Sequence, residues 1–417
     1  MTEATKTSSA VVTPNQPRWR LLCWLTAEPV SLIGDQIFFL AIAWTAVQEA
    51  GPAGAGLVLA AGAVPRALFM LLGGTLVDRL GPRRVALSSD ILRALLMLAA
   101  AVIAAAGATI PLLLALALIF GVIDALFYPA TNALAPLVVA HDQLVRVQNL
   151  RALGTRAAVL IGAPLGGLLL AIGGPSTSFA VNAATFAVSA VALTALRIRS
   201  VVAQHQDGAG GVVRQAMQGL RYALGKPVIR NLLLLVALLE FAVNGVINTA
   251  FPALAAERQW GAQGLGWLMA ALGAGAAAAA LVLVIIRRLP APGLVVAGAA
   301  CTGAIVMSLF PAAVDLPATL TLSVALGAVG GAVAGIVLPI IQADTPPDIL
   351  GRTMSLFALA TVGVSPLSIA AAALITDQAG LRTAFLAAAA LALGGAAACI
   401  TSGPVRNITL KATARAT

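Results

Sequence analysis

Long apolar runs, interrupted by short polar stretches, fill almost the whole chain and limit what it can fold into. Each run reaches about 20 residues, the length that a helix needs to cross the hydrocarbon core of a bilayer. The chain has 60% apolar and 10% charged residues, with a mean hydropathy of +0.99, which excludes an ordinary soluble domain. We therefore predict an all-α membrane protein with twelve transmembrane helices. The predicted segments are 20–47, 55–77, 85–107, 111–136, 149–172, 177–196, 231–255, 263–286, 293–313, 318–342, 354–376 and 383–403.

The basic residues are distributed unevenly over the predicted loops. A net charge of +10 can indicate nucleic-acid binding, but the loops on one side of the membrane hold only Arg258 and Arg382. This asymmetry is the positive-inside pattern, so we predict that both termini are cytoplasmic and that no nucleic acid is bound. The other side carries Arg79, Arg83, Arg84, Arg146, Arg287, Arg288 and Arg352, together with the basic residues of 197–230 and of both tails.

The longest polar interruption divides the chain into two sets of six spans. Its second part, Val212 to Ile229, is expected to form an amphipathic helix on the cytoplasmic membrane face, because its apolar residues fall on one helical face. The predicted organisation is an N-terminal tail (1–19), an N-terminal half (20–196), a central cytoplasmic loop (197–230), a C-terminal half (231–403) and a C-terminal tail (404–417).

The two halves repeat each other at a nearly constant offset. Arg146 before the fifth span recurs as Arg352 before the eleventh, and Phe179 in the sixth span recurs as Phe385 in the twelfth, both 206 positions later. A duplication of six helices is typical of secondary transporters built from parallel repeats.

Charge is concentrated between spans two and three, in the stretch GGTLVDRLGPRR at 73–84. This stretch resembles the signature loop of the major facilitator superfamily through Gly74, Leu76, Asp78, Arg79, Gly81 and Arg83. The resemblance implies the twelve-helix major facilitator fold and a cytoplasmic gate made by these residues. Such a charge network can hold two halves together in one state and break in the other. The alternative is a basic loop that only sets the topology.

A second resemblance concerns spans four and five. The stretches FYPATNALAPLVV (127–139) and IGAPLGGLLL (161–170) are similar to the bacterial branch of macrolide-efflux and siderophore-export proteins. The fifth span also resembles the antiporter motif of drug/proton exchangers, although an alanine replaces the glycine expected before the proline. The alternative is simple packing of two helices by small residues. The matching residues are Gly162, Pro164, Gly166 and Gly167.

Ionisable residues within the spans are few, and such residues normally face a bundle interior or a cavity. Asp35, Asp124 and Glu240 are our candidates for proton coupling, because carboxylates in a low-dielectric cavity can take up and release protons near neutral pH. The alternatives are that Arg66 neutralises Asp35, that Asp124 only hydrogen-bonds a neighbouring helix, and that Asp90 pairs locally with Arg93.

Two of these acids begin polar stripes with a spacing of four residues, which places each stripe on one helix face. In the superfamily that the chain resembles, spans one, four, seven and ten line the central cavity. The cavity is therefore expected to contain Asp124, Tyr128 and Asn132 from span four and Glu240, Asn244 and Asn248 from span seven.

Other chemistries lack their motifs. Gly225 and Lys226 are followed by a proline and do not form a phosphate-binding loop, and neither histidine lies in a predicted span. We therefore expect no enzyme, cofactor or metal site, and energy from an ion gradient. The predicted function is proton-coupled export of lipophilic small molecules by a monomer in a bacterial plasma membrane. Alternatives are a facilitator or importer of a nutrient or lipid-like solute, and a transporter-like sensor or scaffold.

Overall fold

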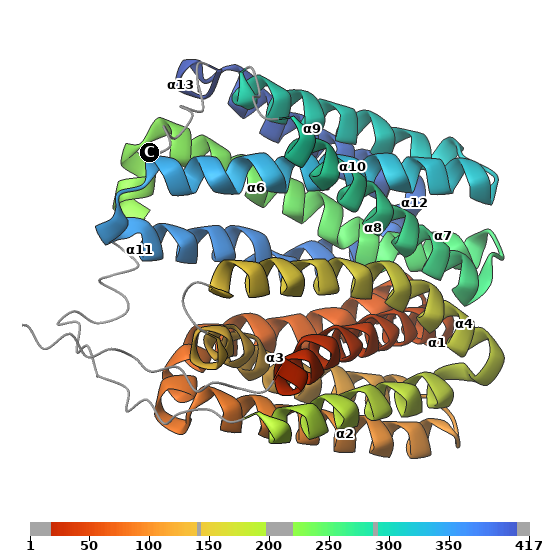
Figure 1. The fold of residues 1–417 in the computed structure, drawn as a ribbon. Helices are drawn as coiled ribbons and strands as arrows, with labels where there is room; N and C mark the ends of the chain where they lie inside the picture. The colour runs from red at the N-terminus through yellow and green to blue at the C-terminus, as the bar shows by residue number, and fades with distance from the viewer. Residues whose placement is uncertain (1–17, 140–142, 197–219, 287–290, 407–417) are drawn as a thin grey trace, which may run out of the picture.

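The computed structural model describes residues 18–139, 143–196, 220–286 and 291–406, and they form helices joined by short turns (Figure 1). The helices are α1 (Arg18–Leu80), α2 (Pro82–Ala104), α3 (Ile110–Val138), α4 (Leu144–Ala195), α6 (Pro227–Gly245), the π-helix η2 (Val246–Ala250), α7 (Phe251–Glu257), α8 (Gly261–Ile285), α9 (Pro292–Leu309), the 3₁₀-helix η3 (Phe310–Ala312), α10 (Leu316–Asp344), α11 (Pro347–Ala358), the π-helix η4 (Leu359–Gly363), α12 (Ser365–Ile400) and α13 (Gly403–Arg406).

Nine helical segments in the described part of the chain are long and apolar enough to cross a membrane. Three of them have 49 to 51 residues, about twice the length of one crossing. Each is broken by a glycine with positive φ, namely Gly51 (65°), Gly174 (65°) and Gly380 (81°), where the chain reverses because glycine tolerates this conformation. The nine segments therefore make twelve crossings, and the predicted fold class is confirmed.

The crossings form two halves, which lie one above the other in Figure 1. In the first half α1 packs against α3 and α4, and in the second half α12 packs against α6 and α9. Each half has its own buried phenylalanine cluster. Phe38 stacks on Phe120 with 4.3 Å between ring centroids, and Phe310 stacks on Phe385 at 5.0 Å.

The amphipathic helix predicted before the second half ends earlier than expected. Residues 220–225 are helical, Lys226 is extended (φ −110°, ψ 102°), and α6 begins at Pro227. The amphipathic helix therefore does not continue to Ile229, because proline disfavours a helical conformation in the residue before it. Its first part, 212–219, lies outside the described residues.

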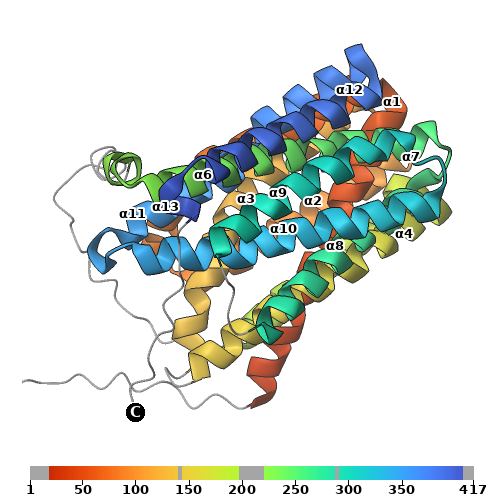
Figure 2. The same cartoon turned by 90° about the horizontal axis from the view of Figure 1, so that it is seen from above.

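Among the described residues, the extensive contacts between the two halves lie toward one end of the bundle. We call this the glycine end, because Gly51, Gly174 and Gly380 lie there, and we call the opposite end, where α1 begins and α13 ends, the basic end. Near the glycine end α1 packs on α12 and α4 on α8. At the basic end α3 and α4 are separated from α11 (Figure 2). The packing between the halves is therefore concentrated near the glycine end.

Candidate functional site

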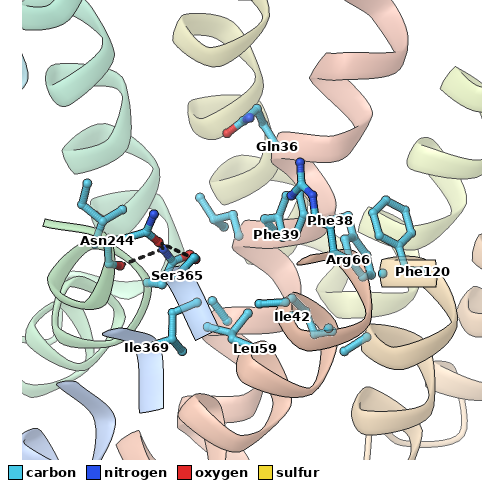
Figure 3. A pocket seen from close by; sticks show the side chains of 18 of the residues that line it. Gln36, Phe38, Phe39, Ile42, Leu59, Arg66, Phe120, Asn244, Ser365 and Ile369 are labelled. Carbon is cyan, nitrogen blue, oxygen red and sulfur yellow. Dashed lines mark hydrogen bonds between the residues drawn. The ribbon is translucent and has the colours of Figure 1, made fainter. Parts of the chain in front are cut away.

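A cavity of about 390 Å³ lies between the two halves. Its first wall comes from α1, α3 and α4, and its second wall comes from α6, η2, α7, α8, η4 and α12. Most of the lining is apolar, with Phe38, Phe39 and Phe120 on the first wall and Ile369 on the second. Figure 3 shows the two walls facing each other. The volume of the cavity is in the range of pockets that bind drug-sized molecules.

The first wall carries one ion pair. Arg66 of α1 lies 3.0 Å from Asp124 of α3, measured from Nε to Oδ2, and both residues line the cavity. The guanidinium of Arg66 also lies 5.9 Å from the ring centroid of Phe39. This pair makes the first wall polar at one point without giving it a net charge.

Behind this wall lies a fully buried guanidinium, Arg93 of α2, which is 0% exposed. It lies 2.5 Å from Asp90, 3.5 Å from Asp124 and 3.6 Å from Asp35, measured between guanidinium nitrogens and carboxylate oxygens. We call Asp35, Asp90, Arg93 and Asp124 the Arg93 cluster. It joins three helices, because Asp35 belongs to α1 and Asp124 to α3.

The Arg93 cluster is rigidly enclosed but incompletely hydrogen-bonded. The guanidinium carbon of Arg93 lies 3.7 Å from the ring centroid of Phe127 and 4.3 Å from that of Phe186. Oδ1 of Asp35 and Oδ2 of Asp90 are buried without a hydrogen-bond partner. Buried carboxylate oxygens in this condition are costly.

The second wall carries a row of polar side chains from α6, η2 and α12. Nδ2 of Asn248 donates to Oδ1 of Asn244 at 2.8 Å, and Oγ of Ser365 donates to the same oxygen at 3.2 Å (Figure 3). Glu240 lies one turn earlier on α6 and also lines the cavity. The row lies beside the two π-helices, η2 and η4, a rare form of helix that often marks functional sites.

The structure brings together five of the predicted cavity residues and separates three. Arg66, Asp124, Glu240, Asn244 and Asn248 line the cavity. Asp35 lies behind the first wall, and Tyr128 and Asn132 lie further along α3 toward the basic end. Tyr128 is 52% exposed, and Asn132 approaches Arg151 at 3.5 Å.

Two predicted pairings need correction. Arg66 pairs with Asp124 and not with Asp35, because α1 and α3 bring these two side chains to the same depth. Arg93 does pair with Asp90, but it also lies close to carboxylates of α1 and α3, so the pair is not merely local. Its i, i+3 spacing indicated only the local contact. Ser365 was missed, since only the fold brings α12 next to α6.

A second buried ion pair lies nearer the basic end. Arg151 of α4 donates to both carboxylate oxygens of Glu28 on α1, at 2.7 and 2.5 Å. This bidentate ion pair holds α1 against α4. No local sequence pattern indicates this pair, because 123 residues separate the partners.

The predicted gate motif spans the end of α1 and the start of α2. The structure does not describe the surroundings of Gly74 or the side chains of Asp78 and Arg79. Gly81 has φ 87° and separates the two helices. Arg83 donates to the carbonyl oxygens of Leu193 and Thr194, at 3.0 and 2.6 Å.

Arg83 therefore binds the end of α4 in its own half, and not the opposite half, as a gate across the two halves would require. The unpaired carbonyls at the end of a helix attract a guanidinium, and at the basic end the opposite half lies apart (Figure 2).

The predicted motif of the fifth crossing lies where α4 meets two other helices. Gly162 and Gly166 pack against α1, at Gln36 and Ile37. Gly167 packs against α8, where an added Cβ would lie 2.5 Å from the carbonyl oxygen of Ala262. The preceding Ala163 and Pro164 face Gly266 of α8.

These glycines thus allow α4 to lie against both α1 and α8, as small residues do between membrane helices. Because α8 belongs to the other half, the motif forms part of the contact between halves.

Comparison with known proteins gives matches along almost the whole chain. The family profile described as Major Facilitator Superfamily matches residues 29–368 and 233–416. The multidrug efflux pump Tap of Mycolicibacterium fortuitum is 27% identical over 385 residues, which cover 89% of this chain and 93% of that protein. The enterobactin exporter EntS of Escherichia coli O1:K1 / APEC is 26% identical over 231 residues, covering 55% and 54%. The solved nucleoside transporter NupG shares the fold, with a TM-score of 0.73 at 14% identity, covering 91% of this chain and 99% of that one.

Proposed function

Because this chain belongs to the major facilitator superfamily, a family of transporters and not of enzymes, we propose that it exports lipophilic small molecules in exchange for protons. One relative is a multidrug efflux pump and another an enterobactin exporter, which supports outward transport of small molecules. The mostly apolar lining of the cavity supports a lipophilic solute.

The proposed mechanism is alternating access. The halves touch near the glycine end and lie apart at the basic end. With both termini in the cytoplasm, as the positive-inside pattern predicts, this is the state open to the cytoplasm. Opening to the outside then requires the α4–α8 and α1–α12 contacts to part. We assign Asp78, Arg79 and Arg83 to the gate that closes at the basic end, where Arg83 exchanges its α4 carbonyls for partners in the other half.

The observation that carries the proton assignment is the imbalance of charge around Arg93. Three buried carboxylates share two guanidiniums, those of Arg93 and Arg66. Asp124 contacts both guanidiniums, whereas Asp35 has only a 3.6 Å contact with Arg93 and a buried oxygen without a hydrogen bond. A buried carboxylate that lacks a full counter-charge gains most from protonation. Asp35 is therefore the proposed proton carrier.

Protonation of Asp35 would weaken its attraction to Arg93 and leave that guanidinium to Asp90 and Asp124. Because the three carboxylates lie on α1, α2 and α3, the change alters how these helices hold together. Asp124 also lines the cavity, so it links the proton carrier to the bound solute.

The test is efflux of ethidium and rhodamine 6G from cells that express wild type, Asp35→Asn or Asp344→Asn, with and without a protonophore. Asp344 is an exposed carboxylate at the end of α10 and gives the same change of charge outside the cluster. We expect wild type and Asp344→Asn to show efflux that the protonophore abolishes, and Asp35→Asn to lose at least tenfold in uphill efflux.

Proteoliposomes separate coupling from folding. There we expect Asp35→Asn to retain downhill dye movement, since the cavity lining is intact. Efflux insensitive to the protonophore, or wild-type uphill efflux by Asp35→Asn, would refute the proposed coupling. Net uptake of the dyes would favour the importer instead.

A further inference from the structure

The two walls of the cavity differ in charge. On the first wall Arg66 and Asp124 neutralise each other at 3.0 Å. Among the described residues that line the second wall, Glu240 is the only ionisable one. The ion pairs of the described residues join Arg66, Arg93 and Arg151 to other carboxylates, and none of them includes Glu240. The cavity therefore has one carboxylate without a counter-charge.

The neighbours of Glu240 on the second wall are neutral. Asn244, Asn248 and Ser365 line the cavity beside it. They hydrogen-bond one another, because Asn248 and Ser365 both donate to Oδ1 of Asn244. These polar side chains carry no charge that could neutralise the carboxylate of Glu240.

We propose that Glu240 is the counter-charge for the cationic group of a monovalent lipophilic cation, and that it does not carry the coupling proton. This inference rests on the proposed function, in which the Arg93 cluster carries the proton. Burial of an isolated carboxylate is unfavourable, and a cation in contact with it offsets part of that cost.

The opposite wall suits the rest of such a molecule. Phe38, Phe39 and Phe120 line this side of the cavity and make it apolar, and aromatic rings also attract cations. A lipophilic anion of the same shape would meet the uncompensated carboxylate and be repelled. Charge, rather than shape, is then the property by which this cavity discriminates.

Two probes of nearly equal shape and opposite charge test this directly. Tetraphenylphosphonium is a monovalent cation, and tetraphenylborate is the corresponding anion. Binding of each is measured by equilibrium dialysis to purified full-length protein in nanodiscs of neutral lipid, with no ion gradient. We expect wild type to bind the phosphonium at least tenfold more tightly than the borate.

The variants are Glu240→Gln and Glu257→Gln. Glu257 is an exposed carboxylate at the end of α7, so its replacement is the matched control. We expect Glu240→Gln to lose the preference for the cation, because the amide keeps the shape and the hydrogen bonding but not the charge. Glu257→Gln should keep the preference.

Three results would overturn the inference: no binding of the phosphonium by wild type, an equal or stronger affinity for the borate, or an unchanged preference in folded Glu240→Gln. Thermal unfolding of each variant shows whether it is folded. If Glu240→Gln does not fold, Glu240→Asp replaces it, and the shorter acid should keep the preference for the cation with weaker phosphonium binding. The binding measurement involves neither an ion gradient nor transport. A failure of the proposed coupling in the efflux experiment would therefore not change the binding result.

Discussion

At the scale of single residues, Arg93 shows what a local pattern can and cannot reveal. Its spacing from Asp90 predicted a pair on one helix, and that pair exists. The same guanidinium also approaches carboxylates from two other helices and lies between two phenylalanine rings. No spacing along the sequence contains this information, because residues 35, 93 and 124 meet only after α1, α2 and α3 have packed together.

Replacement of Arg93 by methionine is expected to destabilise the protein strongly. Methionine keeps much of the apolar stem but leaves Asp90 buried without a counter-charge, and breaking a buried pair in this way costs about 3–5 kcal/mol. The measurement is the midpoint of thermal unfolding in detergent. Arg93→Lys keeps the charge but loses the planar group between Phe127 and Phe186, so its midpoint should fall between those of methionine and wild type.

The double variant Arg93→Met, Asp90→Asn is the control for this explanation. It removes the isolated charge, so it should recover part of the lost stability. If Arg93→Met unfolds at the wild-type temperature, the ion pairs of the cluster contribute nothing to stability, and the interpretation of Arg93 as its centre is wrong.

At the scale of helices, most of the architecture could be predicted from the sequence. The length of the apolar runs indicated twelve crossings, and turn-forming glycines separate the crossings that the structure joins into long helices, as at Gly51 and Gly174. The π-helices η2 and η4 could not be predicted, because one additional residue in a helical turn leaves no recognisable pattern. The contacts between the halves could not be predicted either, because they depend on the close approach of two backbones at small residues such as Gly266.

Replacement of Gly266 by valine is expected to shift the protein toward the state in which the halves part at the glycine end. An added Cβ would lie 2.7 Å from the carbonyl oxygen of Ala163 on α4, and overpacking of this kind costs about 1–3 kcal/mol. The two states of a transporter differ by only a few kcal/mol, so this cost changes their ratio by about 5- to 150-fold.

The measurement is the distance between spin labels at Glu49 and Gln378, two exposed positions in different halves at the glycine end. We expect Gly266→Val to increase the population with a long distance. Gly298→Val is the matched control, because a Cβ at Gly298 would meet nothing within 4 Å, and it should leave the distances unchanged. Equal distances in Gly266→Val and wild type would mean that the α4–α8 contact does not hold the closed end.

At the scale of the whole molecule, orientation in the membrane and the direction of opening are linked. The halves lie apart at the basic end (Figure 2), and the positive-inside pattern predicts that this end faces the cytoplasm. Tyr128 provides a position from which to test both statements together. It lies one helical turn from Asp124, toward the basic end, and it is 52% exposed, whereas Asp124 is 7% exposed.

Cysteine at position 128 is therefore expected to react with a membrane-impermeant maleimide from the cytoplasmic side only. The experiment uses a background in which Cys23, Cys301 and Cys399 are replaced by alanine, and it compares inside-out with right-side-out vesicles. Tyr128→Cys should be labelled in the inside-out vesicles, because the space between the halves admits the reagent from the basic end. Gln378→Cys, at the glycine end, should be labelled in the right-side-out vesicles only. Reversed labelling of both positions would mean that the protein has the opposite orientation in the membrane, and that the direction of transport is the opposite of the one proposed. Labelling of Gln378→Cys alone would mean that the basic end is closed in the membrane, so the resting state would be open to the outside.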